Sequence, residues 1–266
     1  MTLTLHAHPL SSYCWKVLIA LYENGAEFEF AMVDFTDETS VAAFFALWPV
    51  GRMPVLVDRG RAIVESSVII EHLDTHHRGP VRLLPHRADP DAALRVRMMD
   101  RIFDNYVMTP MQAIVGERIR RDGSRDPYSV AQAQTTLDRA YGWLEGGLAS
   151  RAWAAGADFS LADCAAMPAL HYAEKVHPFR DRFPVLAGYL DRLEARPSVR
   201  RVLAEAAPYA HLFRRSDSPV RNRGPAPGGC RPHPRYATRG NQGKLEPCGD
   251  KNASPPGPLH PLPWPH

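Results

Sequence analysis

The sequence is poor in cysteine, with only Cys14, Cys164, Cys230 and Cys248 among 266 residues. These four show none of the paired spacings of a disulfide framework or a zinc knuckle. No apolar run approaches the roughly 18 residues that a membrane-spanning helix needs. The first residues also lack the basic start and the apolar stretch of a secretory signal. We therefore expect a cytoplasmic protein with no disulfides and no membrane partner.

Charge and proline are distributed unevenly along the chain, whose formal net charge is +3. Residues 214–266 hold nine Lys or Arg, three Asp or Glu and 12 of the 25 Pro. The first 213 residues are slightly acidic, with 23 basic and 26 acidic side chains. The basic excess therefore belongs to a proline-rich tail without apolar periodicity, which we predict to be disordered and without a role. We expect no nucleic-acid partner for the folded part.

The first 76 residues alternate between the patterns of strands and helices. We predict strands at 2–7, 28–33, 54–57 and 62–64. We predict helices at about 12–24, begun by Ser11 or Ser12, and at 68–76, begun by Ser66 or Ser67. With a short apolar stretch at 41–48, the order is βαβαββα. One small mixed sheet follows, because strands joined by a helix pair parallel and a tight hairpin pairs antiparallel.

The rest of the chain is helical in pattern after a segment rich in Gly and Pro. We predict helices at about 91–108, 128–149, 160–174, 184–195 and 198–207, with a break at Thr109-Pro110. The fold class is thus an α+β domain followed by an all-helical domain. The predicted boundaries are 1–77 for the first domain, 78–90 for a linker, 91–213 for the helical domain and 214–266 for the tail.

The first chemically suggestive motif is SSYCWK at 11–16, where a strand passes into a helix. Unpaired amides and the helix macrodipole favour an anion at such a point. A serine hydroxyl there can donate a hydrogen bond to a thiolate and lower the pKa of the thiol. Simple capping of the helix by Ser11 explains the same residue without any chemistry.

Two further motifs follow at the ends of strands. In GRMPV at 51–55, a cis bond before Pro54 would expose the Met53 backbone to an extended peptide. In VESS at 64–67, Glu65 and Ser66 could bind an amino group and a carboxylate at a helix start. Taken singly, each motif is better explained by an ordinary trans turn or by a helix cap preceded by a surface charge.

The three motifs in this order, followed by a Pro-rich linker and helices, resemble the cytosolic glutathione S-transferase superfamily, in particular its theta and zeta classes, over about residues 1–212. The resemblance implies a thioredoxin-like first domain, a helical second domain and a homodimer. In FSLAD at 159–163, it implies a capping box in which Asp163 reaches back to Ser160. Glutathione is the implied co-substrate.

The resemblance also assigns roles residue by residue. Ser11 matches the catalytic serine of theta-like members, whereas Ser12 is favoured by the zeta-like pair of serines before a tryptophan. The implied glutathione contacts are Arg52, Met53, cis-Pro54, Glu65, Ser66 and Gln112. Cys14 lacks the partner of a redox Cys-x-x-Cys motif, because the matching position is Ser11. Its simplest interpretation is a partly buried packing residue.

The resemblance leaves three functions open. The first is transfer of glutathione to a small electrophile, the second is a zeta-like cis–trans isomerisation, and the third is a binding or scaffold role without turnover. We expect no metal, because His8, His72, His76 and His77 form no evident triad. His72 and His76 share a helical face, but the sequence shows no third ligand beside them.

Overall fold

A four-stranded mixed sheet with three helices forms the first part of the computed structural model, which describes residues 3–85, 89–120 and 124–214. The elements are β1 (Leu3–Ala7), α1 (Ser12–Glu23), β2 (Phe28–Met32), α2 (Glu38–Leu47), β3 (Val55–Asp58), β4 (Arg61–Val64) and α3 (Ser66–His76). The strand order is β2-β1-β3-β4. β1 pairs parallel with β2 and antiparallel with β3, and β3 and β4 form an antiparallel hairpin. The predicted tail lies outside the described residues, except for Arg214.

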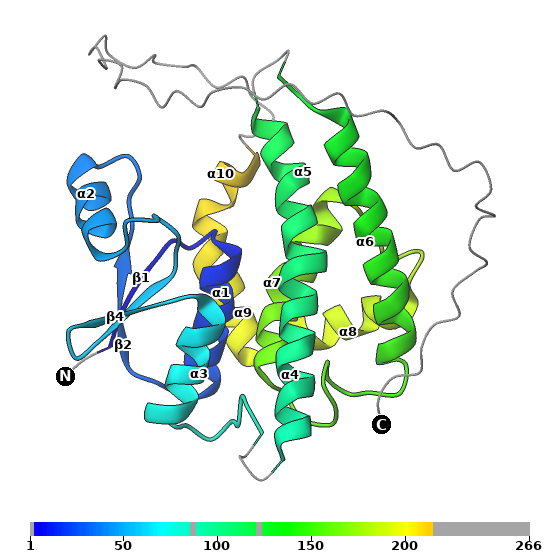
Figure 1. Ribbon diagram of the computed structural model, residues 1–266, viewed down its shortest axis with the longest axis horizontal. Helices are drawn as coiled ribbons and strands as arrows, with labels where there is room; N and C mark the ends of the chain where they lie inside the picture. Colours follow the sequence, from blue (N-terminus) through cyan, green and yellow to red (C-terminus); the bar gives the residue numbers. More distant parts are fainter. Residues whose placement is uncertain (1–2, 86–88, 121–123, 215–266) are drawn as a thin grey trace, which may run out of the picture. The chain divides into compact units, whose positions relative to one another are not determined.

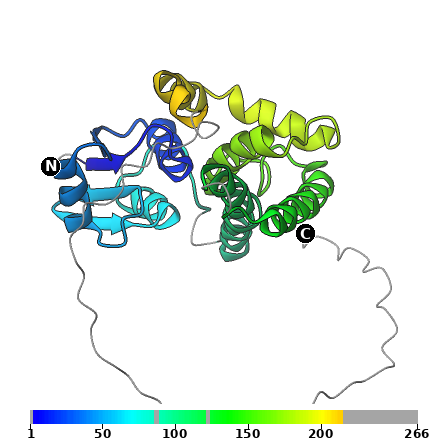
Figure 2. The ribbon, with the colours of Figure 1, turned by 90° about the horizontal axis from the view of Figure 1, so that it is seen from above.

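β1 is an inner strand of the sheet, and its alternate residues Leu3, Leu5 and Ala7 are buried. α2 adds a small apolar cluster on the sheet, in which Phe44 packs with Val33 and Val55. α1 and α3 pack against each other, and α1 also packs against the helical part. Figures 1 and 2 show α1 and α3 between the strands and the remaining helices. The start of α1 therefore lies where both parts of the molecule meet.

The remaining elements are all helical within the described ranges. They are α4 (Pro90–Ile102), the π-helical η1 (Phe103–Met108), α5 (Thr109–Ile119), α6 (Pro127–Leu148), α7 (Leu161–Val176), α8 (Pro184–Glu194), α9 (Pro197–Ala206), η2 (Ala207–Tyr209) and α10 (Ala210–Arg214). α7 is buried almost throughout and packs against α1, α4 and η1. This arrangement confirms the predicted fold class. None of the helices among these residues is long and apolar enough to span a bilayer.

The predicted helix break at Thr109-Pro110 is wrong. α4, η1 and α5 follow one another without an intervening loop, with Pro110 in the first turn of α5. Proline lacks a donor and crowds the preceding turn, which normally interrupts a helix. Here the wider π-helical turn of η1 precedes it, and Thr109 donates from its hydroxyl to the Asp104 carbonyl at 2.9 Å. The helix can thus continue past the proline.

Candidate functional site

A cavity of about 680 Å³ lies beside the start of α1 and is lined by both the sheet part and the α4–α5 region. It brings together seven of the eight site residues that the sequence predicts. They are Ser11, Arg52, Met53, Pro54, Glu65, Ser66 and Gln112. These residues come from separate loops and helices, so only the folded chain places them around one space. The eighth, Ser12, is buried and does not line the cavity.

Ser11 is the N-cap of α1 and lies half-buried at the cavity wall. Its Oγ accepts a long hydrogen bond, 3.4 Å, from the Cys14 amide. Because the hydroxyl acts as an acceptor in this cap, it can donate its own proton, either to the Cys14 thiol, with which it forms a side-chain hydrogen bond, or to a ligand in the cavity. The preceding loop is fixed from two sides. Tyr172 on α7 donates to the Leu10 carbonyl at 2.9 Å, and Trp15 donates to the Pro9 carbonyl at 2.5 Å.

The neighbours of Ser11 differ sharply in what they can do. Ser12 Oγ lies 3.5 Å from Gln112 Nε2, so Gln112 contacts the buried serine as well as the cavity. Tyr13 also lines the cavity, and burial raises the pKa of its hydroxyl to about 12. It remains a proton donor at neutral pH and is the structural rival of Ser11.

Cys14 is fully buried rather than partly buried. Burial raises the pKa of its thiol to about 11, so the thiol stays protonated at pH 7. Thiol–disulfide exchange requires an accessible thiolate. Cys14 is therefore a packing residue of α1. Cys164 on α7 is likewise buried, whereas Cys230 and Cys248 lie outside the described residues.

The Met53–Pro54 peptide bond is cis, as the resemblance implies. Met53 is half-buried at the cavity, and Pro54 is buried just before β3. Among the described residues, the Met53 amide and carbonyl form no hydrogen bonds. Two backbone groups at the cavity are thus available to pair with an extended ligand. Arg52 is exposed beside them and adds a positive charge at the cavity edge.

The start of α3 differs from the predicted cap at Ser66 or Ser67. Ser66 does not cap the helix; it is the first helical residue and is buried, and Glu65 is the capping position. Glu65 has a φ of 70°, in the left-handed region that non-glycine residues seldom occupy. Such backbone strain is concentrated at binding and catalytic sites. The helix start leaves free amides beside Ser66, which favours binding of a carboxylate.

A buried charge cluster, which sequence patterns do not predict, borders the cavity. Lys16 on α1, only 1% exposed, forms ion pairs with Asp100 and with Asp104, the latter at 2.8 Å. Arg101 pairs with the same two carboxylates at 2.6 and 2.7 Å, and Ser67 donates to Asp100 at 2.8 Å. Burial, followed by the charge of Asp100, raises the pKa of Asp104 despite the opposing Lys16 charge.

The cluster joins α1 and α3 to the helical part through charges, beside the packing of α1 against α7. Asp104 also lines the cavity, and its Oδ1 has no hydrogen-bond partner among the described residues. Lysine and aspartate are rarely buried unless they are paired. Only the fold reveals that residues so far apart in the sequence neutralise one another.

A thioredoxin-like sheet with a cis-proline, followed by a helical second part, is the architecture of the glutathione S-transferase fold. The comparisons with known proteins agree. The glutathione S-transferase N-terminal domain family matches residues 5–81, and the C-terminal domain family matches residues 127–192. The chain belongs to the cytosolic glutathione S-transferase superfamily.

Individual relatives span different roles. The chain is 32% identical over 221 residues to FtsZ-localized protein A of Caulobacter vibrioides, covering 78% of this chain and 95% of that one. It is 28% identical over 213 residues to a probable maleylacetoacetate isomerase of Vibrio cholerae, covering 78% and 96%. A glutathione S-transferase structure from Methylobacillus flagellatus with glutathione bound matches with a TM-score of 0.68 and 28% identity, covering 76% and 98%.

Proposed function

We propose that this protein binds glutathione in the cavity and activates its thiol as a thiolate for attack on a small electrophile. The observation that carries the proposal is the convergence of Ser11, the Met53 backbone and the Glu65-Ser66 pair on one cavity. Membership of the superfamily supports glutathione as the co-substrate. The Ser11 hydroxyl would donate its proton to the sulfur at the start of α1.

The remaining lining residues fit the other parts of the tripeptide. The Met53 amide and carbonyl would pair with the cysteinyl backbone in extended form. The Glu65 carboxylate would bind the ammonium of the γ-glutamyl group. Ser66 and the start of α3 would bind the carboxylate of the same group. Arg52 would attract the remaining carboxylate, and Gln112 lies on the wall that faces the electrophile.

The required pKa shift is within reach of these groups. A free thiol with a pKa near 8.5 is only a few per cent ionised at pH 7. A decrease of about two units makes the thiolate dominant and corresponds to roughly 2.7 kcal/mol. A hydrogen bond to a charged group contributes about 1.5–3 kcal/mol. The start of α1 contributes about 0.3–1 kcal/mol more.

The direct test of the proposed function combines binding with turnover. Calorimetry should show saturable binding of glutathione, and the protein should conjugate glutathione to chloro-dinitrobenzene. Failure to bind glutathione would exclude both the transferase and the isomerase. Binding without conjugation would point to the alternatives below.

Ser66→Ala should weaken glutathione binding about tenfold or more, because it removes a hydrogen bond to a carboxylate. The Michaelis constant for glutathione should rise with little change in the turnover number, since this contact is equally strong in the ground state and the transition state. Steady-state kinetics measures both constants. Ser40→Ala is the matched control, because Ser40 is half-buried outside the cavity. Equal Michaelis constants for both variants would remove Ser66 from the site.

A second candidate is the isomerase function, which the maleylacetoacetate isomerase relative favours. Glutathione would add to a cis-diene acid and leave again from the same cavity. Turnover of maleylacetone without net consumption of glutathione would select this function.

A third candidate is a binding role without catalysis, favoured by the relative that is named for its localisation with FtsZ. The cavity would then bind glutathione, or only preserve the fold, while an outer surface serves the function. Retention on immobilised glutathione, with no transferase, isomerase or peroxidase turnover, would favour it.

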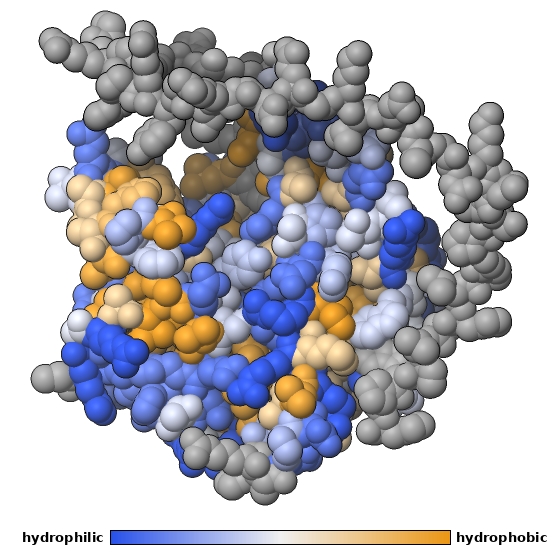
Figure 3. All heavy atoms as spheres, viewed as in Figure 1, coloured by the Kyte–Doolittle hydropathy of each residue, from blue (hydrophilic) through white to orange (hydrophobic). Residues whose placement is uncertain are grey.

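We also propose that two copies associate as a homodimer. Val68 on α3 and Leu94 and Met98 on α4 are large apolar side chains that are exposed. Figure 3 shows apolar surface over the strands and over α4 on this face. Exposed apolar area of this kind marks protein interfaces. Sedimentation should give twice the chain mass for the wild type, and Leu94→Glu with Met98→Glu should give monomers; an unchanged mass for the double variant would exclude this face.

A further inference from the structure

Three side chains converge at the far end of α3 from the glutathione cavity. Asp58 ends β3, His72 lies on α3, and His77 is the residue that caps the end of this helix. None of the three lines the cavity. α3 has 11 residues, so its two ends are about 15 Å apart. The cluster is thus separate from the proposed site.

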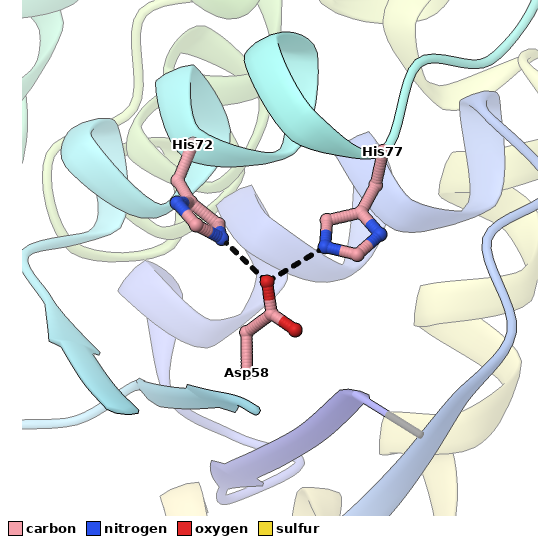
Figure 4. A group of neighbouring side chains, drawn as sticks. All are labelled: Asp58, His72 and His77. Carbon is pink, nitrogen blue, oxygen red and sulfur yellow. Dashed lines mark hydrogen bonds and ion pairs between the residues drawn. The ribbon is translucent and has the colours of Figure 1, made fainter. Parts of the chain in front are cut away.

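The local backbone explains why the three meet. Arg59 and Gly60 have positive φ values of 51° and 77°, which form the tight hairpin turn directly after Asp58. On a regular helix, residues five apart point about 140° away from each other. His77, however, leaves the helix with a φ of −132° and a ψ of 55°. Its ring therefore returns to the side of His72, and both rings point at Asp58 (Figure 4).

The distances resemble those within a metal coordination shell. Nε2 of His72 and Nε2 of His77 lie 2.9 and 2.8 Å from Oδ2 of Asp58. The three candidate ligand atoms all lie within 4.8 Å of one another. Ligands about 2.0–2.2 Å from a tetrahedral zinc ion are about 3.4 Å apart. Small side-chain rotations would therefore admit an ion between the two nitrogens and the oxygen.

We propose that Asp58, His72 and His77 bind a divalent transition-metal ion, with Zn²⁺ as the reference ion. Two imidazoles and one carboxylate form a donor set typical of such ions. Asp58 is 7% exposed, whereas the His72 and His77 side chains are 18% and 24% exposed, which leaves one side open to solvent for water ligands. The negative end of the α3 dipole also favours a cation at this position.

The surrounding charges are compatible with an ion. The guanidinium of Arg59 lies 3.9 Å from Asp58 Oδ1, but its side chain is 73% exposed and can move into solvent. The His76 ring packs against the His72 ring at an angle of 46°, with ring centroids 4.6 Å apart, and is not one of the three clustered residues. The sequence prediction of no metal considered His72 with His76. In the structure His72 lies beside His77 at Asp58, whose carboxylate is the third candidate ligand.

A bound ion would link the hairpin β3–β4 to the end of α3. The same hairpin leads from Pro54 to Glu65, so the ion would stiffen the frame that carries the glutathione contacts. The proposal does not depend on catalysis. Metal binding can therefore be tested independently of the proposed function.

The test uses the full chain without an affinity tag, freed of metal by a chelator, in the absence of glutathione. Calorimetric titration with Zn²⁺ should show one site per chain, and Co²⁺ should give the visible absorption of a nitrogen- and oxygen-ligated ion. His77→Ala and His72→Gln should each weaken Zn²⁺ binding about tenfold or more. His76→Ala is the matched control and should bind as the wild type does.

Thermal unfolding provides a second readout that also reports folding of each variant. Saturating Zn²⁺ should raise the melting temperature of the wild type and of His76→Ala, because the ion binds only the folded site. The same Zn²⁺ concentration should raise the melting temperature of His77→Ala and Asp58→Asn clearly less, because their binding is weaker. Absence of Zn²⁺ binding by the wild type, or equally tight binding by the His72 and His77 variants, would overturn the proposal.

Discussion

Lys16→Met should destabilise the protein by about 3–5 kcal/mol at pH 7. The Lys16 ammonium pairs with Asp100 and Asp104, which are both buried, and donates to the part-buried Ser67 at 2.8 Å. Methionine would fill a similar volume but leave two buried carboxylates facing each other. Among the described residues, the half-exposed Arg101 would be the one cation left in contact with them. The melting temperature should fall by roughly 6–20 °C.

The loss of stability in Lys16→Met should become smaller as the pH is lowered. Burial already raises the pKa of Asp104, and removal of Lys16 raises it further. The folded variant then binds a proton at a higher pH than the unfolded chain, whose aspartates titrate near 3.9. Its unfolding free energy therefore falls as the pH rises above about 4, and recovers as the pH is lowered. The difference in unfolding free energy between the wild type and Lys16→Met should decrease from pH 7 toward about pH 4.

Arg200→Met is the control, because Arg200 is an exposed cation on α9. Its stability should lie within about 0.5 kcal/mol of the wild type at each pH. Denaturant unfolding of both variants measures the effect. A Lys16 variant as stable as the control at pH 7 would show that the buried pairs contribute nothing to stability.

Asp163→Ala should cost about 3–5 kcal/mol, because Asp163 accepts four hydrogen bonds in the core. Its Oδ1 accepts from the Ala154 amide at 2.8 Å and from the Tyr189 hydroxyl at 2.6 Å. Its Oδ2 accepts from the amide and the hydroxyl of Ser160 at 2.9 and 3.0 Å. Alanine would leave these buried donors without partners and free the start of α7.

Asp163→Ala should also disturb the cavity around Ser11, because Tyr172 on α7 donates the hydrogen bond that holds the loop before Ser11. Chemical unfolding followed by circular dichroism measures the loss. Asp158 is an exposed aspartate in the loop before α7, so Asp158→Ala is the control and should change stability by less than about 0.5 kcal/mol. Equal stability of the two variants would contradict a structural role for the Asp163 network.

The order of strands and helices in the first part was predictable from periodicity, because the two kinds of element differ clearly in their apolar pattern. The reach of Asp163 back to the Ser160 amide was also predictable, since capping depends on local spacing alone. The continuity of α4, η1 and α5 was not predictable. Pro110 signals a break, and only the π-helical turn before it, a feature of tertiary packing, allows the helix to continue.

The site was predictable in composition but not in detail. The motifs around Ser11, Met53 and Glu65 identify loops that the fold brings together. The positive φ of Glu65, the burial of Lys16 and the meeting of Asp58 with His77 depend on long-range packing. Lysine side chains are normally exposed, so sequence alone predicts an exposed Lys16. Lys16 is buried instead because it pairs with Asp100 on α4 and Asp104 on η1.

The central claim is that the Ser11 hydroxyl stabilises the glutathione thiolate. The most direct test is titration of enzyme-bound glutathione by thiolate absorbance in the wild type and in Ser11→Ala, Ser12→Ala and Tyr13→Phe. We expect a thiol pKa about two units below that of free glutathione in the wild type and in the Ser12 and Tyr13 variants. In Ser11→Ala it should return close to the free value. An unchanged pKa in Ser11→Ala, with a return to the free value in Ser12→Ala or Tyr13→Phe, would contradict the assignment.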